Sequence, residues 1–225
     1  MSRLIEARGL RYRYPDQTQA LDGVDFHLDS GECVALFGAN GSGKTTFVLQ
    51  LNGLLKGEGS LTINGRIGLV FQESDDQLFM PTVLEDVAFG PRNLGLDQHA
   101  AIERARHALK QVGMLATAEK APYHLSAGEK RRVAIAGVLA MEPDVLVFDE
   151  PTTYLDPPAE RELARLLQSL PQAKLLVTHD IAFARALATR AVFFERGRVA
   201  GEGTVEDVIT RFDWDSLRSL SPDRR

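Results

Sequence analysis

The stretch that decides the fold is GANGSGKT, Gly38–Thr45, which fits the pattern G-x-x-x-x-G-K-T at every fixed position. It follows the apolar run ECVALF (32–37) and precedes the apolar run TTFVLQLNGLL (45–55). This order predicts a strand, a glycine-rich turn and a helix. Glycines in such a turn let backbone N–H groups point at phosphates, and the helix start adds a favourable dipole. The stretch therefore predicts a phosphate-binding loop.

Each loop residue has an expected part in holding a nucleotide. The Lys44 ammonium would reach the terminal phosphates, and the Thr45 hydroxyl would ligate Mg²⁺. Lys44 is thereby also a candidate catalytic residue. The full set of expected nucleotide contacts in this loop is Gly38, Ala39, Asn40, Gly41, Ser42, Gly43, Lys44, Thr45 and Thr46.

A second apolar run ends in two carboxylates, in VLVFDE (145–150). In open α/β sheets, ligands bind at the carboxyl ends of the strands. We expect Asp149 to hold Mg²⁺ and Glu150 to orient or deprotonate an attacking water. The alternative is a salt-bridged strand end without catalytic function.

The other apolar runs indicate a layered α/β fold. Continuous apolar character, rather than alternation, favours parallel strands buried on both faces. Helical patterns lie between several runs, which indicates an α/β fold with a mostly parallel sheet. Together with the loop Gly38–Thr45, this predicts the core of a phosphate-loop NTPase. The expected strands are residues 32–37, 66–71, 144–149, 174–179 and 191–196.

Two regions depart from this alternation. The N-terminal part, with LIEARGL (4–10), VDFHL (24–28) and LTI (61–63), predicts an antiparallel β subdomain. Residues 73–140 are mostly helical in pattern and predict an α-helical subdomain inserted into a single domain spanning 1–225. Within it, Asp97 is the expected N-cap of a helix whose apolar positions are Ile102, Ala105, Leu109 and Val112.

Composition limits the function. The net charge of −5 argues against nucleic acid as a partner, because phosphate contacts need a basic face. The single cysteine, Cys33, lies in an apolar run and is expected in the core, which suits a reducing cytosol. The start MSRLIEARGL has no long apolar region, and no run approaches the ~18 residues of a membrane span, so we expect neither a signal peptide nor a span.

The order of GANGSGKT, Gln72, LSAGE (125–129), VLVFDEP, YLD (154–156) and His179 resembles the ATP-binding cassette ATPases over nearly the whole chain. That resemblance implies a RecA-like core and ATP sandwiched between two cassettes. Ser126 and the backbone of Gly128 would then contact the partner's ATP, and Asp156 would lie in the loop that crosses the dimer. A homodimer is expected because one chain carries both halves of the site. The pattern Ser126-x-x-Glu129 is also a capping box, in which Glu129 caps the helix backbone.

The resemblance implies further single residues. Tyr14 would stack on adenine, although Tyr12 competes because strand alternation places both tyrosines on one face. Gln72 would sense Mg²⁺ and water and link to a membrane partner. His179 would contact the γ-phosphate, whereas a lone histidine at a strand end is otherwise structural.

The stretches VFQESDDQLFMPTVLEDVAFGPRNLGL (70–96) and YHLSAGEKRRVAIAGVLAMEPDVLVFDEPT (123–152) resemble energy-coupling factor ATPases of the cobalt and nickel type. This implies a peripheral subunit at the cytoplasmic face, with a transmembrane coupling protein and a substrate-binding membrane protein. Cobalt is the expected substrate, and nickel, biotin or another vitamin are the alternatives. A soluble cassette ATPase of repair or translation is disfavoured, since the chain has one cassette and no room for a long coiled coil.

The last expected surface follows Gln72 directly. Asp75 and Asp76, with Leu78 and Phe79, would dock a coupling helix that presents an arginine, as the resemblance implies. The alternative is a solvated turn with a helix cap.

Overall fold

The computed structural model describes residues 2–215. The chain divides into two compact units. Unit 1 is drawn from Met1–Gly65 and Gln172–Arg225, and unit 2 is Arg66–Pro171. The phosphate loop and His179 belong to unit 1. Unit 2 contains Gln72, the LSAGE stretch, Asp149 and Glu150. The expectation of one domain with a helical insert stays a prediction.

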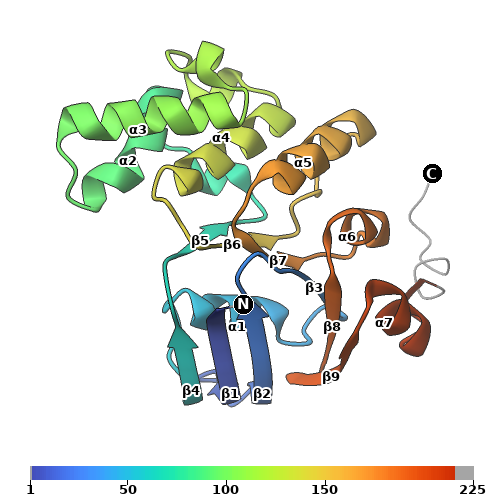
Figure 1. Ribbon diagram of the computed structural model, residues 1–225. Helices are drawn as coiled ribbons and strands as arrows, with labels where there is room; N and C mark the ends of the chain where they lie inside the picture. The colour runs from blue at the N-terminus through green and yellow to red at the C-terminus, as the bar shows by residue number, and fades with distance from the viewer. Residues whose placement is uncertain (1, 216–225) are drawn as a thin grey trace. The chain divides into compact units, whose positions relative to one another are not determined.

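Unit 1 contains the expected antiparallel sheet, in the order β2-β1-β4. Its strands are β1 (Arg3–Arg13), β2 (Gln19–Asp29) and β4 (Glu58–Ile63), which lie side by side in Figure 1. In the register, Ala7 lies opposite Phe26 on β2 and opposite Leu61 on β4. Buried residues recur at every second position over residues 5–7 of β1 and 24–28 of β2, which is the period that a half-buried strand requires.

A second group of strands in unit 1 carries the phosphate loop. β7 (Ala173–Val177) and β8 (Arg190–Glu195) both pair in parallel with β3 (Cys33–Phe37), and β9 (Arg198–Gly203) pairs antiparallel with β8. Every residue of β3 is buried, Cys33 included, which explains its continuous apolar run. The sequence analysis did not predict β9.

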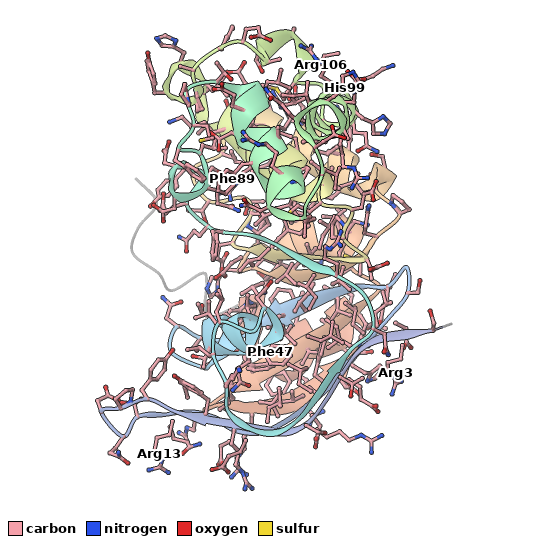
Figure 2. All side chains as sticks on the ribbon, turned by 90° about the vertical axis from the view of Figure 1, so that its left-hand side faces the viewer. Arg3, Arg13, Phe47, Phe89, His99 and Arg106 are labelled. Carbon is pink, nitrogen blue, oxygen red and sulfur yellow. The ribbon has the colours of Figure 1, made fainter. Side chains whose placement is uncertain are left out.

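The helices of unit 1 pack against these strands. They are α1 (Lys44–Leu51), α6 (Ile181–Leu187) and α7 (Val205–Arg211). Phe47, which is labelled in Figure 2, lies on α1. Its ring centroid is 5.2 Å from that of Phe26 and 5.4 Å from that of Phe194, so it links both groups of strands. This packing fixes the helix that follows the phosphate loop.

Unit 2 contains the parallel pair β5 (Ile67–Val70) and β6 (Val145–Asp149), with a long helical stretch between them in sequence. The Asp97 side chain caps α3 (Gln98–Gln111) by accepting from the Ala100 N–H at 2.9 Å, as predicted. His99 and Arg106 are exposed on that helix (Figure 2). The helical elements of unit 2 are η1 (Ser74–Gln77), α2 (Val83–Asn93), α3 (Gln98–Gln111), η2 (Leu115–Thr117), η3 (Pro122–His124), α4 (Ala127–Leu139) and α5 (Pro157–Ser169).

The mostly parallel α/β fold with an N-terminal antiparallel sheet is confirmed. Within residues 2–215, no helix combines the length and the apolar character that crossing a membrane requires.

Candidate nucleotide site

Glycine geometry shapes the phosphate loop. Gly38, Gly41 and Gly43 have φ values of 144°, 76° and 106°, a region that side chains disfavour. A Cβ on Gly38 would lie 2.3 Å from the Phe194 carbonyl oxygen, and one on Gly43 would lie 2.5 Å from the Ala20 oxygen. Only glycine therefore fits at these two positions.

The Lys44 ammonium is held against the loop backbone. Its Nζ donates to the Gly38 oxygen at 2.6 Å and to the Ala39 oxygen at 3.0 Å, and the residue is buried. The Ser42 hydroxyl oxygen is also buried and has no hydrogen-bond partner within residues 2–215. A buried polar atom without a partner costs free energy, so this oxygen fits a loop that takes up a polar ligand.

The start of α1 is built differently from the other helix starts. Its N-cap is Gly43, which provides no capping side chain, and its first turn has no acidic residue. Each of α2 to α7 has an N-cap side chain that accepts a backbone N–H. The first N–H groups of α1 therefore suit an anion, and together with Lys44 they fit the phosphates of a nucleotide. Thr45 is exposed beside them.

The structure places Tyr14 beside this loop. The Tyr14 hydroxyl lies 3.0 Å from Thr46 Oγ1. The rings of Tyr12 and Tyr14 meet edge to face, with their centroids 5.0 Å apart. Tyr12 lines a separate groove with Arg11, Arg13 and Lys56. Tyr14 thus contacts the helix that follows the phosphate loop, while its stacking on adenine stays a prediction.

Asp149 and Glu150 lie at the end of the β6 strand as expected. Asp149 is its last residue, and Glu150 has φ 46°, in the left-handed region. That conformation costs about 1–2 kcal/mol for a residue with a side chain. The Thr153 N–H donates to the Glu150 oxygen at 3.2 Å and closes a turn, and Tyr154 (φ 65°) is also left-handed. Backbone strain of this kind clusters at functional sites, which suits the expected catalytic base.

The LSAGE stretch forms the capping box that the sequence indicated. Ser126 Oγ accepts from the Glu129 N–H at 3.3 Å, and the Glu129 carboxylate accepts from the Ser126 N–H at 2.8 Å. This bond from the Ser126 backbone lowers the pKa of Glu129. Glu129 therefore caps α4, while Ser126 stays exposed at its start.

Gly128 and Asp156 lie at neighbouring helix starts. A Cβ on Gly128 would be 3.2 Å from the Ala159 side chain. The Asp156 carboxylate caps α5 by accepting from the Ala159 N–H at 2.9 Å. The exposed starts of α4 and α5 are thus brought together in unit 2, with Ser126 and Asp156 accessible.

The sequence analysis missed Arg131, which holds the loop that contains Gln72. Arg131 is 3% exposed and donates to the Phe71 and Gln72 oxygens, each at 2.6 Å. Desolvation lowers the pKa of its guanidinium. Arg131 lies at helical spacing from Ile135 and Val138, which are on the buried face of α4. This spacing could have predicted from the sequence that Arg131 is buried. Gln72 itself is exposed.

The four expected docking residues separate into two environments. Asp75 pairs with Lys130, Nζ to Oδ1 2.6 Å, on the surface. Asp76, Leu78 and Phe79 instead line a groove of about 370 Å³. Phe79 meets Phe89 edge to face with centroids 5.0 Å apart. Other residues along the groove are Phe71, Val87, Leu94, Val133 and Met141.

His179 lies two residues beyond β7 and is half-buried. Its imidazole stacks on the indole of Trp214, with centroids 5.7 Å apart and planes 23° apart. The sequence analysis did not include Trp214, because nothing local relates these two positions.

Comparison with known proteins identifies the family. Residues 21–153 match the ABC transporter family. The energy-coupling factor transporter ATP-binding protein EcfA of Methanothermobacter thermautotrophicus is 45% identical, over 92% of this chain and 72% of the relative.

Solved structures agree with this match. CbiO1 from Clostridium perfringens, described as part of the ABC transporter complex cbiONQ, has a TM-score of 0.85 at 34% identity, over 99% of this chain and 96% of its own. The ATP-binding cassette MJ0796, in a dimeric post-hydrolysis state bound to ADP and Pi, has a TM-score of 0.77 at 28% identity. The match covers 90% of this chain and 99% of MJ0796. This chain therefore belongs to the ATPases of the ABC transporter family, and energy-coupling factor ATP-binding proteins are among its relatives.

Proposed function

We propose that this chain is the ATP-hydrolysing motor of an energy-coupling factor importer, and that cobalt ion is the transported substrate. The observation that carries the motor function is the phosphate loop, in which the Lys44 ammonium and the uncapped start of α1 converge. The relationship to EcfA and CbiO1 supports the transporter class. Cobalt rests on the resemblance of residues 70–96 and 123–152.

The loop and Lys44 bind the β- and γ-phosphates, and Tyr14 stacks on adenine. Thr45, Gln72 and Asp149 are the oxygen donors that would hold Mg²⁺, a donor set that this ion prefers. Mg²⁺ would neutralise the charge that develops on the transferred phosphoryl group. The exposed Thr45 hydroxyl and the strand-end position of Asp149 support this assignment.

Glu150 takes the proton from the attacking water, and His179 contacts the γ-phosphate. The left-handed backbone at Glu150 supports a functional role, because strained backbone conformations cluster at functional sites. These two groups and Gln72 complete the catalytic set with Lys44.

The active unit in this proposal is a homodimer in which Ser126 and Gly128 contact the partner's ATP. Capping uses a lone pair of the Ser126 hydroxyl, so its hydrogen can still donate to a phosphate oxygen. Asp156 contributes the loop that crosses the dimer. The dimeric structure of MJ0796 supports this arrangement.

The composite site has a direct test by mixing two inactive variants. Lys44→Ala removes the charge on the phosphates, and Ser126→Arg blocks the trans contact. In a mixed dimer, one of the two sites has an intact phosphate loop from one subunit and an intact Ser126 from the other. Activity should therefore return on mixing. Proven mixed dimers without activity would contradict independent composite sites.

The groove lined by Asp76, Leu78 and Phe79 is the proposed docking site for a helix of the transmembrane coupling protein. Phe79 is 62% exposed, and exposed apolar residues gathered along a groove are typical of an interaction site. Asp76 would hold an arginine of that helix by paired hydrogen bonds. Asp75 stands outside this contact because Lys130 engages it.

The neighbouring aspartates provide a matched pair of variants. Asp76→Asn should weaken pull-down of the coupling protein and lower uptake, while the soluble variant still binds ATP. Asp75→Asn should assemble like the wild type. If both variants bind the coupling protein as well as the wild type does, the solvated-turn interpretation of these residues holds instead.

The transported substrate is tested by uptake in cells that express this chain with its membrane partners. Cobalt uptake that disappears in Glu150→Gln is the expected result. Uptake of nickel or biotin alone would overturn the cobalt assignment and keep the motor function. A chain that never co-purifies with membrane proteins would favour the soluble ATPase alternative and overturn the peripheral location at the cytoplasmic face.

A further inference from the structure

The ring of Trp214 meets two parts of the nucleotide-binding machinery of unit 1. Its stack on His179 has a centroid distance of 5.7 Å, within the range of favourable aromatic pairs. Its centroid also lies 6.4 Å from that of Phe37, the residue that precedes the phosphate loop. Trp214 is the single tryptophan of the sequence.

The chain fixes Trp214 in this place through a series of contacts. Thr204 and Asp207 form a capping box that starts α7. After α7, Phe212 stacks on Phe193 with centroids 4.1 Å apart and planes 3° apart. Asp213 then turns the chain with φ 49°, and Trp214 meets the same Phe193 edge-on at 5.2 Å.

The contact restricts the imidazole more than burial alone would. The planes are 23° apart, so the imidazole meets the indole face to face rather than edge-on. His179 is half-buried, and the indole on its face adds a contact that limits the rotamers of the ring. Holding a contacting group in one orientation lowers the entropic part of a reaction barrier.

We propose that Trp214 is a positioning residue for His179, keeping the imidazole in the orientation that contacts the γ-phosphate. This inference rests on the proposed role of His179. It makes the segment after α7 part of the catalytic apparatus, although Trp214 itself touches no nucleotide in the proposal. The competing interpretation is that Trp214 only covers the apolar cluster of Phe37, Ala184 and Phe193, against which it packs.

Two substitutions separate these interpretations. Trp214→Leu keeps an apolar cover and loses the aromatic ring, whereas Trp214→Phe keeps a ring that can stack. In the full chain without nucleotide, proton NMR should show the His179 ring protons shifted upfield by the indole. That shift should disappear in Trp214→Leu and persist in part in Trp214→Phe, with His179→Ala used to assign the signals.

Kinetics provide the second measurement. Trp214→Leu should lower the kcat of ATP hydrolysis about fivefold, equivalent to about 1 kcal/mol of barrier, with KM for ATP changed less than twofold. Trp214→Phe should restore most of the kcat. Thermal unfolding of both variants checks that they fold.

The outcomes are distinct. An unchanged His179 spectrum and kcat in a folded Trp214→Leu protein would show that Trp214 only covers the core and would overturn the inference. Equal losses of kcat in the Leu and Phe variants would also overturn it. If His179→Ala hydrolyses ATP like the wild type, the proposed role of His179 fails, while NMR separately reports whether Trp214 orients the ring.

Discussion

Replacing Arg131 with methionine should destabilise unit 2 and loosen the Gln72 loop. The guanidinium makes two hydrogen bonds of 2.6 Å to backbone oxygens and is 3% exposed. Bonds to a charged group contribute about 1.5–3 kcal/mol each, or roughly 3–6 kcal/mol together. Desolvation of the charge opposes this, as the lowered pKa of Arg131 indicates. The expected net loss is about 2–4 kcal/mol, or roughly 4–16 °C in Tm.

Arg132→Met is the matched control, since it changes the same residue type at the next position of α4. Arg132 pairs with Glu162 on the surface at 2.6 Å, and such pairs contribute below about 1 kcal/mol. Urea and thermal unfolding give the two stabilities, and hydrogen exchange reports protection of the amides at residues 71–73. Exchange there should accelerate only in Arg131→Met. Equal stability losses in the two variants, or an unchanged loop, would refute the reasoning.

Three further experiments test other parts of the account. Lys44→Ala should nearly abolish ATP binding and hydrolysis, because it removes the charge held at the loop; turnover like the wild type would contradict the site. Gly38→Ala should cost about 2–4 kcal/mol in urea unfolding, because the Cβ meets a backbone oxygen, while Gly137→Ala, which meets nothing within 4 Å, should cost nothing. Burial raises the pKa of Cys33 to about 12, so the folded protein should resist iodoacetamide at pH 8 and react once urea unfolds it; rapid labelling of the folded protein would count against this.

Local patterns were sufficient to predict much of the fold. The run 32–37 became β3 at Cys33–Phe37, and the run 191–196 became β8 at Arg190–Glu195, because continuous burial in a parallel arrangement requires continuous apolar character. The capping box of Ser126 and Glu129 and the Asp97 cap were also visible, since their partners lie three residues apart.

Other features depend on contacts that leave no local pattern. β9 has a mixed sequence, RVAGEG, and is a strand because Gly197, with φ 75°, turns it back onto β8. The stack of His179 on Trp214 joins positions far apart in sequence. Asp75 and Asp76 look equivalent as neighbours, yet one meets Lys130 and the other lines a groove. Such differences arise only once α4 and η1 are packed.

The measurement that tests the central claim most directly is the mass of Glu150→Gln in solution with and without ATP. The amide keeps the shape of the side chain and cannot accept the proton of the attacking water, so ATP should bind and persist. Light scattering after gel filtration should then show a monomer without ATP and a dimer with it, while Lys44→Ala combined with Glu150→Gln stays monomeric. A Glu150→Gln protein that hydrolyses ATP at the wild-type rate, or binds ATP and remains a monomer, would contradict the account.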